Sequence, residues 1–491
     1  MKRITLIYMI ILSSAIIKGQ GFEEALKFSQ NFAGGTARFT SMGGAFGALG
    51  GDISVLSTNP AGIAVYQKGA FTFTPAYNKN LAKTRYFGTD RDEFNLNLSI
   101  DNIGLVTTIK SKNKQLVNIN FGFGYNRLAD FNSNQIFEGI NSGEGTNPAS
   151  SLVDYFLHQA WGNHPDDLDP YVEGLAYDGY VIDLDTNALP EFEYYTDMPP
   201  PGQTYQKRII ETSGRINEWA FALGANYAHK LYFGATLGIQ SLHYEKISNH
   251  RESDNANDEL LFDYYRFNAY RGTGYNLKLG FIYKPIQLIR IGGAIHTPTI
   301  LRFEHEYDAK IYSIFSNPSN LYPSDESGNY YDIGFYDYKM VTPLKAIASI
   351  GLQFKKLLLL SFDYEYIDYS QIRYREDADL NEMDEVNTAL SDYLKPAGNI
   401  KTGAELRLGD FSIRGGFIHY GTPYGKNDFN KDAKYYSISS GVGLRVNSFF
   451  FDVSYIYSVR EELIRAYDHF YSPVDADYRI SKIAATIGFR F

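Results

Sequence analysis

The fold of this chain is indicated by its last strand, residues 481–491, which read SKIAATIGFRF. Successive side chains of a strand point to opposite faces of the sheet. One face here is apolar from Ile483 to Phe491, and the other carries small or polar residues such as Thr486 and Arg490. This alternation is typical of a transmembrane β-barrel strand, with lipid on one side and a polar lumen on the other. A half-buried strand of a soluble sandwich alternates in the same way, so the rest of the chain must decide.

Thirteen further segments alternate in the same manner and are separated by turn residues. The fourteen predicted strands are 69–79, 94–110, 116–127, 215–229, 231–247, 266–284, 287–307, 336–355, 357–373, 395–409, 411–422, 434–447, 448–461 and 478–491. An even number is expected of a closed bacterial barrel.

The connections between these segments alternate in length, which favours the barrel over the sandwich. Those after even-numbered strands are short, whereas those after odd-numbered strands are long: 80–93, 128–214, 248–265, 308–335, 374–394, 423–433 and 462–477. Outer-membrane barrels place short turns at the periplasmic end and long loops at the extracellular end. The sequence therefore predicts an all-β protein, a 14-stranded antiparallel transmembrane β-barrel over residues 69–491, in which 128–214 is the longest loop.

The first residues predict export. Lys2 and Arg3 precede an apolar run from Ile4 to Ile17, and the small residue Gly19 precedes Gln20. This order is typical of a secretory signal peptide, here 1–19. A single membrane anchor is the alternative, but the run is shorter than the roughly 20 residues that a spanning helix needs. Export together with a barrel predicts the outer membrane of a Gram-negative bacterium.

Composition agrees with a barrel and excludes several classes of function. Aromatic residues make up 16% of the chain, with 41 Tyr and 34 Phe, which suits strands and interfacial girdles. The chain has no Cys, so thiolate chemistry is excluded. A net charge of −10 argues against a nucleic-acid partner. The nine His are scattered, and no Ser/His spacing in the strands indicates a nucleophile with a base. We expect no enzyme activity, no metal and no cofactor.

Residues 20–68, here called the hatch segment, precede the first strand and do not alternate. Glycines crowd the region from Gly34 to Gly51, but the stretch lacks the Gly-Lys-Ser/Thr ending of a phosphate-binding loop. Apolar residues are frequent between Phe22 and Leu49. A packed plug in the lumen is therefore predicted, and a disordered periplasmic tail is the alternative.

Several motifs together resemble the FadL-type outer-membrane transporters of hydrophobic compounds. The hatch segment ends in the proposed hatch residues Asn59, Pro60, Ala61 and Gly62 ahead of fourteen strands. Local similarities follow in order along the chain, at 290–294 with 297–299, 363–369, 403–407 and 412–417. The resemblance implies a hatch in the lumen, ligand capture by outer loops, and passive transport of hydrophobic molecules, by default long-chain fatty acids. It also implies lateral exit through a break in the wall near the third strand, here 116–127.

The outer loops are where ligand choice is expected. Loop 128–214 has fifteen acidic residues, whereas Lys207 and Arg208 are basic. A solvated surface explains this charge, and divalent-cation binding is the alternative. Two apolar faces at helical spacing predict a hydrophobic groove through which ligand enters, although each face would also pack under its own loop. They consist of Val153, Phe156, Leu157 and Trp161, and of Met383, Val386 and Leu390.

Inward-facing cations are candidate anchors for a carboxylate head group. They are Lys278, Arg290, Lys345, Arg407 and Arg414. Asp363, Glu365 and Glu405 also point inward, so ion pairs across the lumen are the alternative role for these cations.

The combined prediction is passive outer-membrane transport by loop capture, hatch movement and lateral exit. The alternatives are a general diffusion porin, against which the hatch segment argues, and an adhesive or structural surface barrel. The expected partners are a hydrophobic small molecule, outer-membrane lipid, and the barrel-assembly machinery through the strand ending at Phe491. We expect a monomer.

Overall fold

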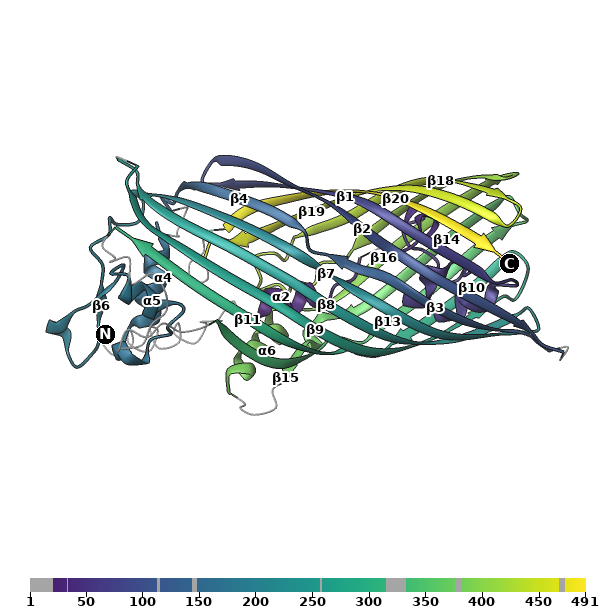
Figure 1. Ribbon diagram of the computed structural model, residues 1–491, viewed down its shortest axis with the longest axis horizontal. Helices are drawn as coiled ribbons and strands as arrows, with labels where there is room; N and C mark the ends of the chain where they lie inside the picture. Colours follow the sequence, from purple (N-terminus) through teal and green to yellow (C-terminus); the bar gives the residue numbers. More distant parts are fainter. Residues whose placement is uncertain are drawn as a thin grey trace.

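The computed structural model describes residues 21–32, 34–112, 115–143, 148–256, 258–314, 333–375, 381–467 and 473–491. The predicted signal peptide, 1–19, lies outside the described residues. No helix of the described part combines the length and the apolarity needed to cross a membrane. Figure 1 shows an elongated barrel whose strands run obliquely along its long axis, with the N-terminal segment inside it.

The described strands form one antiparallel sheet of eighteen elements that closes on itself, because β1 pairs with β20 from Ala70↔Arg490 onward. Four wall strands are interrupted and consist of two elements each, β3 with β4, β10 with β11, β12 with β13, and β14 with β15, so the described wall has fourteen strands. The elements are β1 Ala70–Tyr86, β2 Thr89–Lys110, β3 Leu116–Asp130, β4 Ser133–Ile140, β7 Thr204–Tyr227, β8 Leu231–Asp254, β9 Leu260–Tyr283, β10 Ile289–His296, β11 Ile300–Ser313, β12 Gly334–Val341, β13 Lys345–Phe354, β14 Leu358–Asp368, β15 Arg373–Arg375, β16 Pro396–Leu408, β17 Phe411–Tyr420, β18 Lys434–Val446, β19 Phe449–Arg465 and β20 Pro473–Arg490. The predicted barrel is confirmed.

Several strands are longer at the long-loop end than the sequence predicts. β1 and β2 pair as far as Tyr86↔Thr89, so the predicted loop 80–93 is wrong and is a hairpin that turns at Phe87 and Gly88. The predicted loop 248–265 is likewise mostly strand, since β8 ends at Asp254 and β9 begins at Leu260. Beyond the lipid neither face has to be apolar, so the alternation that marks a strand in the sequence fades there.

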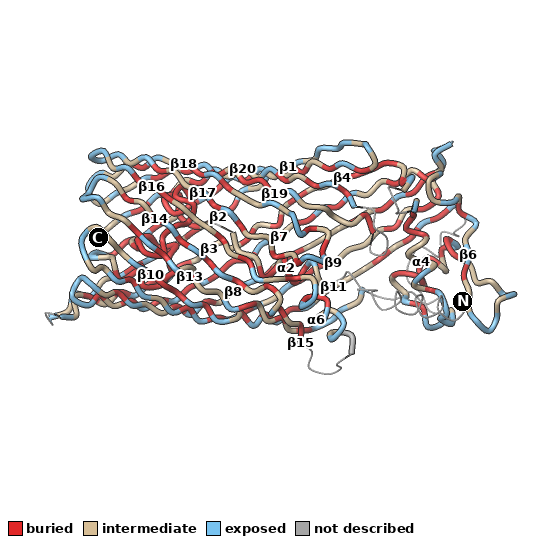
Figure 2. The backbone as a smooth tube through the Cα atoms, turned by 180° about the vertical axis from the view of Figure 1, so that it is seen from behind, coloured by how far each residue is buried: buried red, intermediate tan, exposed pale blue. Residues whose placement is uncertain are grey.

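The outside of the barrel is apolar. On β9, Tyr275, Leu277 and Leu279 are exposed, whereas the intervening Asn276 and Lys278 are buried inside. Exposed rows of this kind recur around the wall, which is the reverse of a soluble protein and matches a lipid-facing belt. Figure 2 shows buried residues gathered inside the barrel toward the end that holds the C-terminus. The short turns lie at that end, here called the short-turn end, which faces the periplasm in this class.

The hatch segment packs inside the barrel. It comprises α2 Phe22–Ser29, α3 Ala37–Ser41 and the 3-10 helices η1 Ile53–Ser57 and η2 Pro60–Val65. Its contacts with the wall include a buried ion pair from Arg38 to Glu405 (2.7 Å) and a hydrogen bond from the Gly47 N–H to Asp363 (2.8 Å). The disordered tail is thereby excluded for the described residues 34–68, of which nearly all between Thr36 and Ala64 are buried.

Helical segments lie at the long-loop end. The longest loop is shorter than the predicted 128–214, because β4 and the start of β7 lie within that range, and it spans 141–203. It holds α4 Leu152–Ala160, η3 Pro165–Asp167, α5 Glu173–Asp178 and η4 Thr186–Ala188, together with the short strands β5 Asp183–Leu184 and β6 Tyr194–Tyr195. Its buried residues, such as Phe156 and Leu175, form one cluster with Phe262 and Tyr264 of β9. A second helix, α6 Asn381–Tyr393, follows η6 Tyr369–Gln371 and β15. In Figure 1 α4 and α5 lie beyond the strand ends and α6 lies beside the barrel.

Candidate functional site

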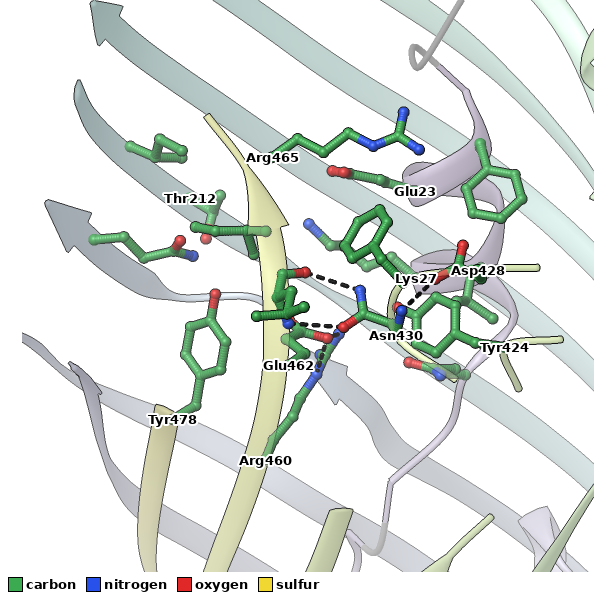
Figure 3. A pocket seen from close by; sticks show the side chains of 18 of the residues that line it. Glu23, Lys27, Thr212, Tyr424, Asp428, Asn430, Arg460, Glu462, Arg465 and Tyr478 are labelled. Atoms are coloured by element: carbon green, nitrogen blue, oxygen red, sulfur yellow. Dashed lines mark hydrogen bonds and ion pairs between the residues drawn. The ribbon is translucent and has the colours of Figure 1, made fainter. Parts of the chain in front are cut away.

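Two adjoining cavities lie in the lumen between α2 and the wall. They have volumes of about 140 Å³ and about 170 Å³. Both are lined by Lys27 and Gln30 of the hatch segment and by Arg460, Glu462 and Tyr478 of the wall. Figure 3 shows the first cavity, with Lys27 on α2 facing Arg460 and Glu462 on β19. The two cavities are therefore neighbouring parts of one lumenal site.

Helix α2 packs against the wall with one face and lines the cavity with the other. One face is buried, and its Phe28 ring packs edge-on against Tyr244 (5.5 Å between centroids) and Tyr270 (5.4 Å). The other face carries Lys27, whose Nζ donates to the Tyr244 hydroxyl (2.8 Å). Burial lowers the pKa of Lys27, because the ammonium has lost much of its water. An anion that enters the cavity would stabilise the charged form of Lys27.

The first cavity is amphipathic. Its apolar lining includes Phe22, Leu26 and Ile210, and Tyr424 and Tyr478 add aromatic surface. Its charged lining is basic overall, with five cations and three carboxylates: Lys27, Arg208, Lys246, Arg460 and Arg465 against Glu23, Asp428 and Glu462. This lining suits a ligand with an apolar body and an anionic group.

One wall of this cavity is held by a hydrogen-bonded loop. Asn430 accepts from the Leu463 N–H (2.7 Å) and donates to the Leu463 carbonyl (2.8 Å), so it acts like a strand residue beside β19. The Asp428 carboxylate accepts from the Asn430 N–H (2.7 Å). Burial raises the pKa of Asp428. On β19 itself, Arg460 pairs with Glu462 at 2.6 Å.

The second cavity extends to an interruption in the wall. The hydrogen-bonded ladder between β2 and β3 ends at Asn102↔Asn126, and beyond it the described residues of β2 pair with β1 alone. Side chains bridge the gap: Asn97 donates to Asp130 (2.9 Å), and Asp130 also pairs with Arg127 (3.0 Å). The backbone therefore leaves an opening that polar side chains close.

The outer face of the barrel is hollowed at the same place. The hollow is lined by Pro75, Tyr77, Leu98, Tyr125 and Arg127, among others. Strand register shifts nearby, between Thr74 and Pro75 on β1 and between Arg127 and Ala129 on β3. Arg127 lines both this outer hollow and the second lumenal cavity. A single side-chain layer thus separates the lumen from the lipid side.

The predicted hatch residues are fixed against the wall. Asn59 caps η2 by accepting from the Ala61 N–H (3.1 Å) and donates to the Phe281 carbonyl of β9 (3.1 Å). A Cβ added to Gly234 of β8 would come within 2.3 Å of Pro60, so glycine is required for this close approach. Asn59, Pro60, Ala61 and Gly62 are all buried.

The predicted carboxylate anchors are already engaged. Lys278 pairs with Glu218 (2.5 Å), and Lys345 with Glu365 (3.5 Å). Arg407 and Arg414 share Glu405 at 2.5 Å and 2.7 Å, and Arg290 donates to the Leu49 carbonyl of the hatch segment (2.6 Å). None of the five lines either of the two cavities beside α2, whereas Lys278 and Lys345 line a smaller lumenal cavity of about 70 Å³. The cations that line the two cavities beside α2, such as Lys27 and Arg460, were missed by the sequence analysis.

The two predicted apolar faces lie in different places. Val153 and Phe156 are buried in the cluster of the longest loop, Leu157 packs against it, and Trp161 is 56% exposed. Leu390 is buried with α2 in another cluster, against which Met383 and Val386 pack. The structure therefore does not join the two faces into one groove; the second face borders the element that forms the cavity.

No known protein family and no curated protein matches this sequence. Among solved structures, a Pseudomonas aeruginosa FadL homologue is similar, with a TM-score of 0.58 and 14% identity over 94% of this chain and 100% of that chain. The chain has the FadL-type fold. The P. putida toluene transporter TodX is also similar, with a TM-score of 0.50 and 10% identity over 94% of this chain and 99% of that one. At these identities the likeness concerns the fold, and it confirms the FadL-type resemblance seen in the sequence.

Proposed function

We propose that this protein carries small hydrophobic molecules passively across the outer membrane, with long-chain fatty acids as the expected class. The observation that supports this function is the juxtaposition of a lumenal cavity with a gap in the wall, with Arg127 lining both sides of it. The FadL-type fold, shared with a toluene transporter, is consistent with it.

The lining of the cavities suggests how such a ligand is held. The apolar body of the ligand contacts Phe22, Leu26 and Ile210, and its carboxylate is held by Lys27. A hydrocarbon chain gains about 0.8 kcal/mol for each CH₂ that leaves water, so passage from water through the cavity into lipid is favourable overall. The passage from water to lipid as a whole therefore needs no external energy source.

The proposed exit is tested by closing the gap with a disulfide. The chain has no Cys, so Asn97→Cys with Asp130→Cys introduces a single defined pair. The matched control is Ser437→Cys with Ser458→Cys, whose hydroxyls lie 2.7 Å apart in the unbroken ladder of β18 and β19. All four residues line the second cavity. The two pairs therefore differ in that only the first pair crosses the gap.

Uptake of radiolabelled oleate is measured in cells that produce each variant, before and after reduction. We expect the oxidised gap variant to fall to the level of cells without the protein and to recover on reduction, whereas the control transports in both states. Undiminished uptake by cells with the oxidised gap variant would overturn the proposal of lateral exit. Extraction of bound fatty acid from the purified barrel tests the substrate class, and a large ion conductance in the intact protein would point instead to a porin.

A further inference from the structure

Arginines gather around the lumen at the short-turn end, away from the two cavities. Arg290 of β10, Arg407 of β16, Arg445 of β18 and Arg490 of β20 occupy inward positions close to the strand ends. Arg38 of α3 lies next to Arg407, because the two share the Glu405 carboxylate. All four wall arginines are partly accessible, so solutes on this side can reach them.

The carboxylates near these arginines already accept hydrogen bonds from other groups. Glu405 accepts from Arg38, Arg407 and Arg414 at 2.5–2.7 Å. Asp452 pairs with Arg414 at 2.6 Å. Asp52 of the hatch segment accepts from the Thr36 hydroxyl (2.8 Å) and the Ser54 N–H. These acidic groups therefore leave part of the positive charge of the arginines uncompensated.

Two arginines in particular lack an acidic partner. Among the described residues, neither Arg445 nor Arg490 makes a side-chain ion pair, and the Nε of each is buried without a hydrogen-bond acceptor. The Arg490 guanidinium lies 5.5 Å from the centre of the Phe450 ring. Phe450 is also the register partner of Arg445 in the β18–β19 ladder. Arg445 and Arg490 thus stand on the two strands that flank Phe450, and both occupy inward positions at the same mouth.

The surrounding turns add to this positive charge. They contribute Lys112, Lys230, Lys284, Lys355 and Lys356, whereas Asp410 is the acidic residue among their described positions. The chain as a whole carries a net charge of −10, so its negative charge is concentrated away from this end. Such a field attracts anions from the periplasmic side.

We propose that the short-turn mouth is an anion-binding site in which Arg445 and Arg490 together hold a phosphate group. The planar guanidinium fork matches phosphate oxygens bidentately, and two unpaired forks on either side of Phe450 form a chelating pair. The phosphate belongs to the head group of a phospholipid in the inner leaflet or to a free phosphorylated solute. This site is separate from the proposed transport route and does not depend on it.

The test measures binding of inorganic pyrophosphate and of dihexanoyl phosphatidylglycerol, below its micelle concentration, to the purified full-length barrel by calorimetry. We expect Arg445→Gln with Arg490→Gln to weaken binding at least about tenfold. The matched control, Lys355→Gln with Lys356→Gln, removes the same charge from a turn at the same end and should retain binding. Equal losses in both variants, or no saturable binding to the unaltered protein, would overturn the proposal.

A second measurement keeps the proposal testable should the arginine variant not fold. Phenylglyoxal modifies accessible arginines, and peptide mass spectrometry reports the extent at each position in the unaltered barrel. Pyrophosphate or the short-chain lipid should protect Arg445 and Arg490, and unchanged labelling of both would contradict the site. Tighter binding of the lipid assigns the phosphate to a head group, and equal binding of pyrophosphate assigns it to a solute.

Discussion

Removing the charge of Glu405 should loosen the hatch segment. Glu405 is 1% exposed and receives the guanidinium groups of Arg38, Arg407 and Arg414 at 2.5–2.7 Å. Glu405→Gln keeps the volume and one acceptor oxygen but leaves the buried Arg38 without a counter-ion. Breaking a buried ion pair costs about 3–5 kcal/mol. Arg407 is 30% exposed and is solvated by water, so the cost falls chiefly on Arg38, the member that belongs to the hatch segment.

The expected effect is a larger population of molecules in which the hatch segment has separated from the wall. Each 1.4 kcal/mol is a factor of ten, so a loss of about 3–5 kcal/mol raises the open population by roughly two to three and a half orders of magnitude. Hydrogen–deuterium exchange of residues 36–51 in the detergent-solubilised barrel measures that population directly. The strands themselves should keep their protection.

The control for this experiment is Glu461→Gln. Glu461 pairs with Lys434 at 3.2 Å, but the two side chains are 47% and 71% exposed. A surface pair of this kind contributes about 0–1 kcal/mol, so exchange in 36–51 should not change. Unchanged exchange in Glu405→Gln, with the barrel intact, would refute the conclusion that the buried ion pair holds the hatch segment in place.

Three further changes test other contacts. Gly234→Ala places a Cβ about 2.3 Å from Pro60, so exchange near Pro60 should rise while the β8 ladder stays protected. Phe28→Ala removes the ring at the centre of the α2 cluster and should cost about 3–5 kcal/mol, visible as a lower midpoint of barrel unfolding on unboiled gels. Burial raises the pKa of Asp428, so the stability of its loop falls as the pH rises from the ordinary carboxyl pKa through the raised one. Asp428→Asn keeps an acceptor for the Asn430 N–H and should abolish that pH dependence in exchange measurements of the loop.

The barrel could be predicted from the sequence because lipid imposes a pattern of period two on each strand. Where lipid ends, that constraint ends, and the prediction failed at the hairpin between Tyr86 and Thr89. The packing of the hatch segment was also predictable, since its apolar residues alternate with glycines that allow close contact with the wall, as at Gly47 beside Asp363.

The cavity was beyond the reach of the sequence for a physical reason. Periodicity tells which face a residue occupies, but it does not tell which distant residue it meets. Lys27 and Arg460 are brought together by closure of the barrel around α2, and neither belongs to a local motif. By contrast, ion pairing of the inward-facing cations was predicted as an alternative, because Glu405 and the arginines face the same lumen; the pair of Arg407 with Glu405 lies within one strand and not across the lumen.

The contacts of the hatch segment bear on which part of it moves during transport. Arg38, Gly47 and Asn59 are held by a buried ion pair and by buried hydrogen bonds to the wall, which nothing replaces when they break. Helix α2 is held by ring contacts of Phe28, by the hydrogen bond from Lys27 to Tyr244 and by the pairing of Glu24 with Lys246 (3.6 Å), and Lys27 and Lys246 also line the cavity. The gap beside Arg127 opens from that same cavity. The proposed transport route therefore predicts that a ligand displaces α2, which borders this cavity, whereas Arg38, Gly47 and Asn59 stay in contact with the wall.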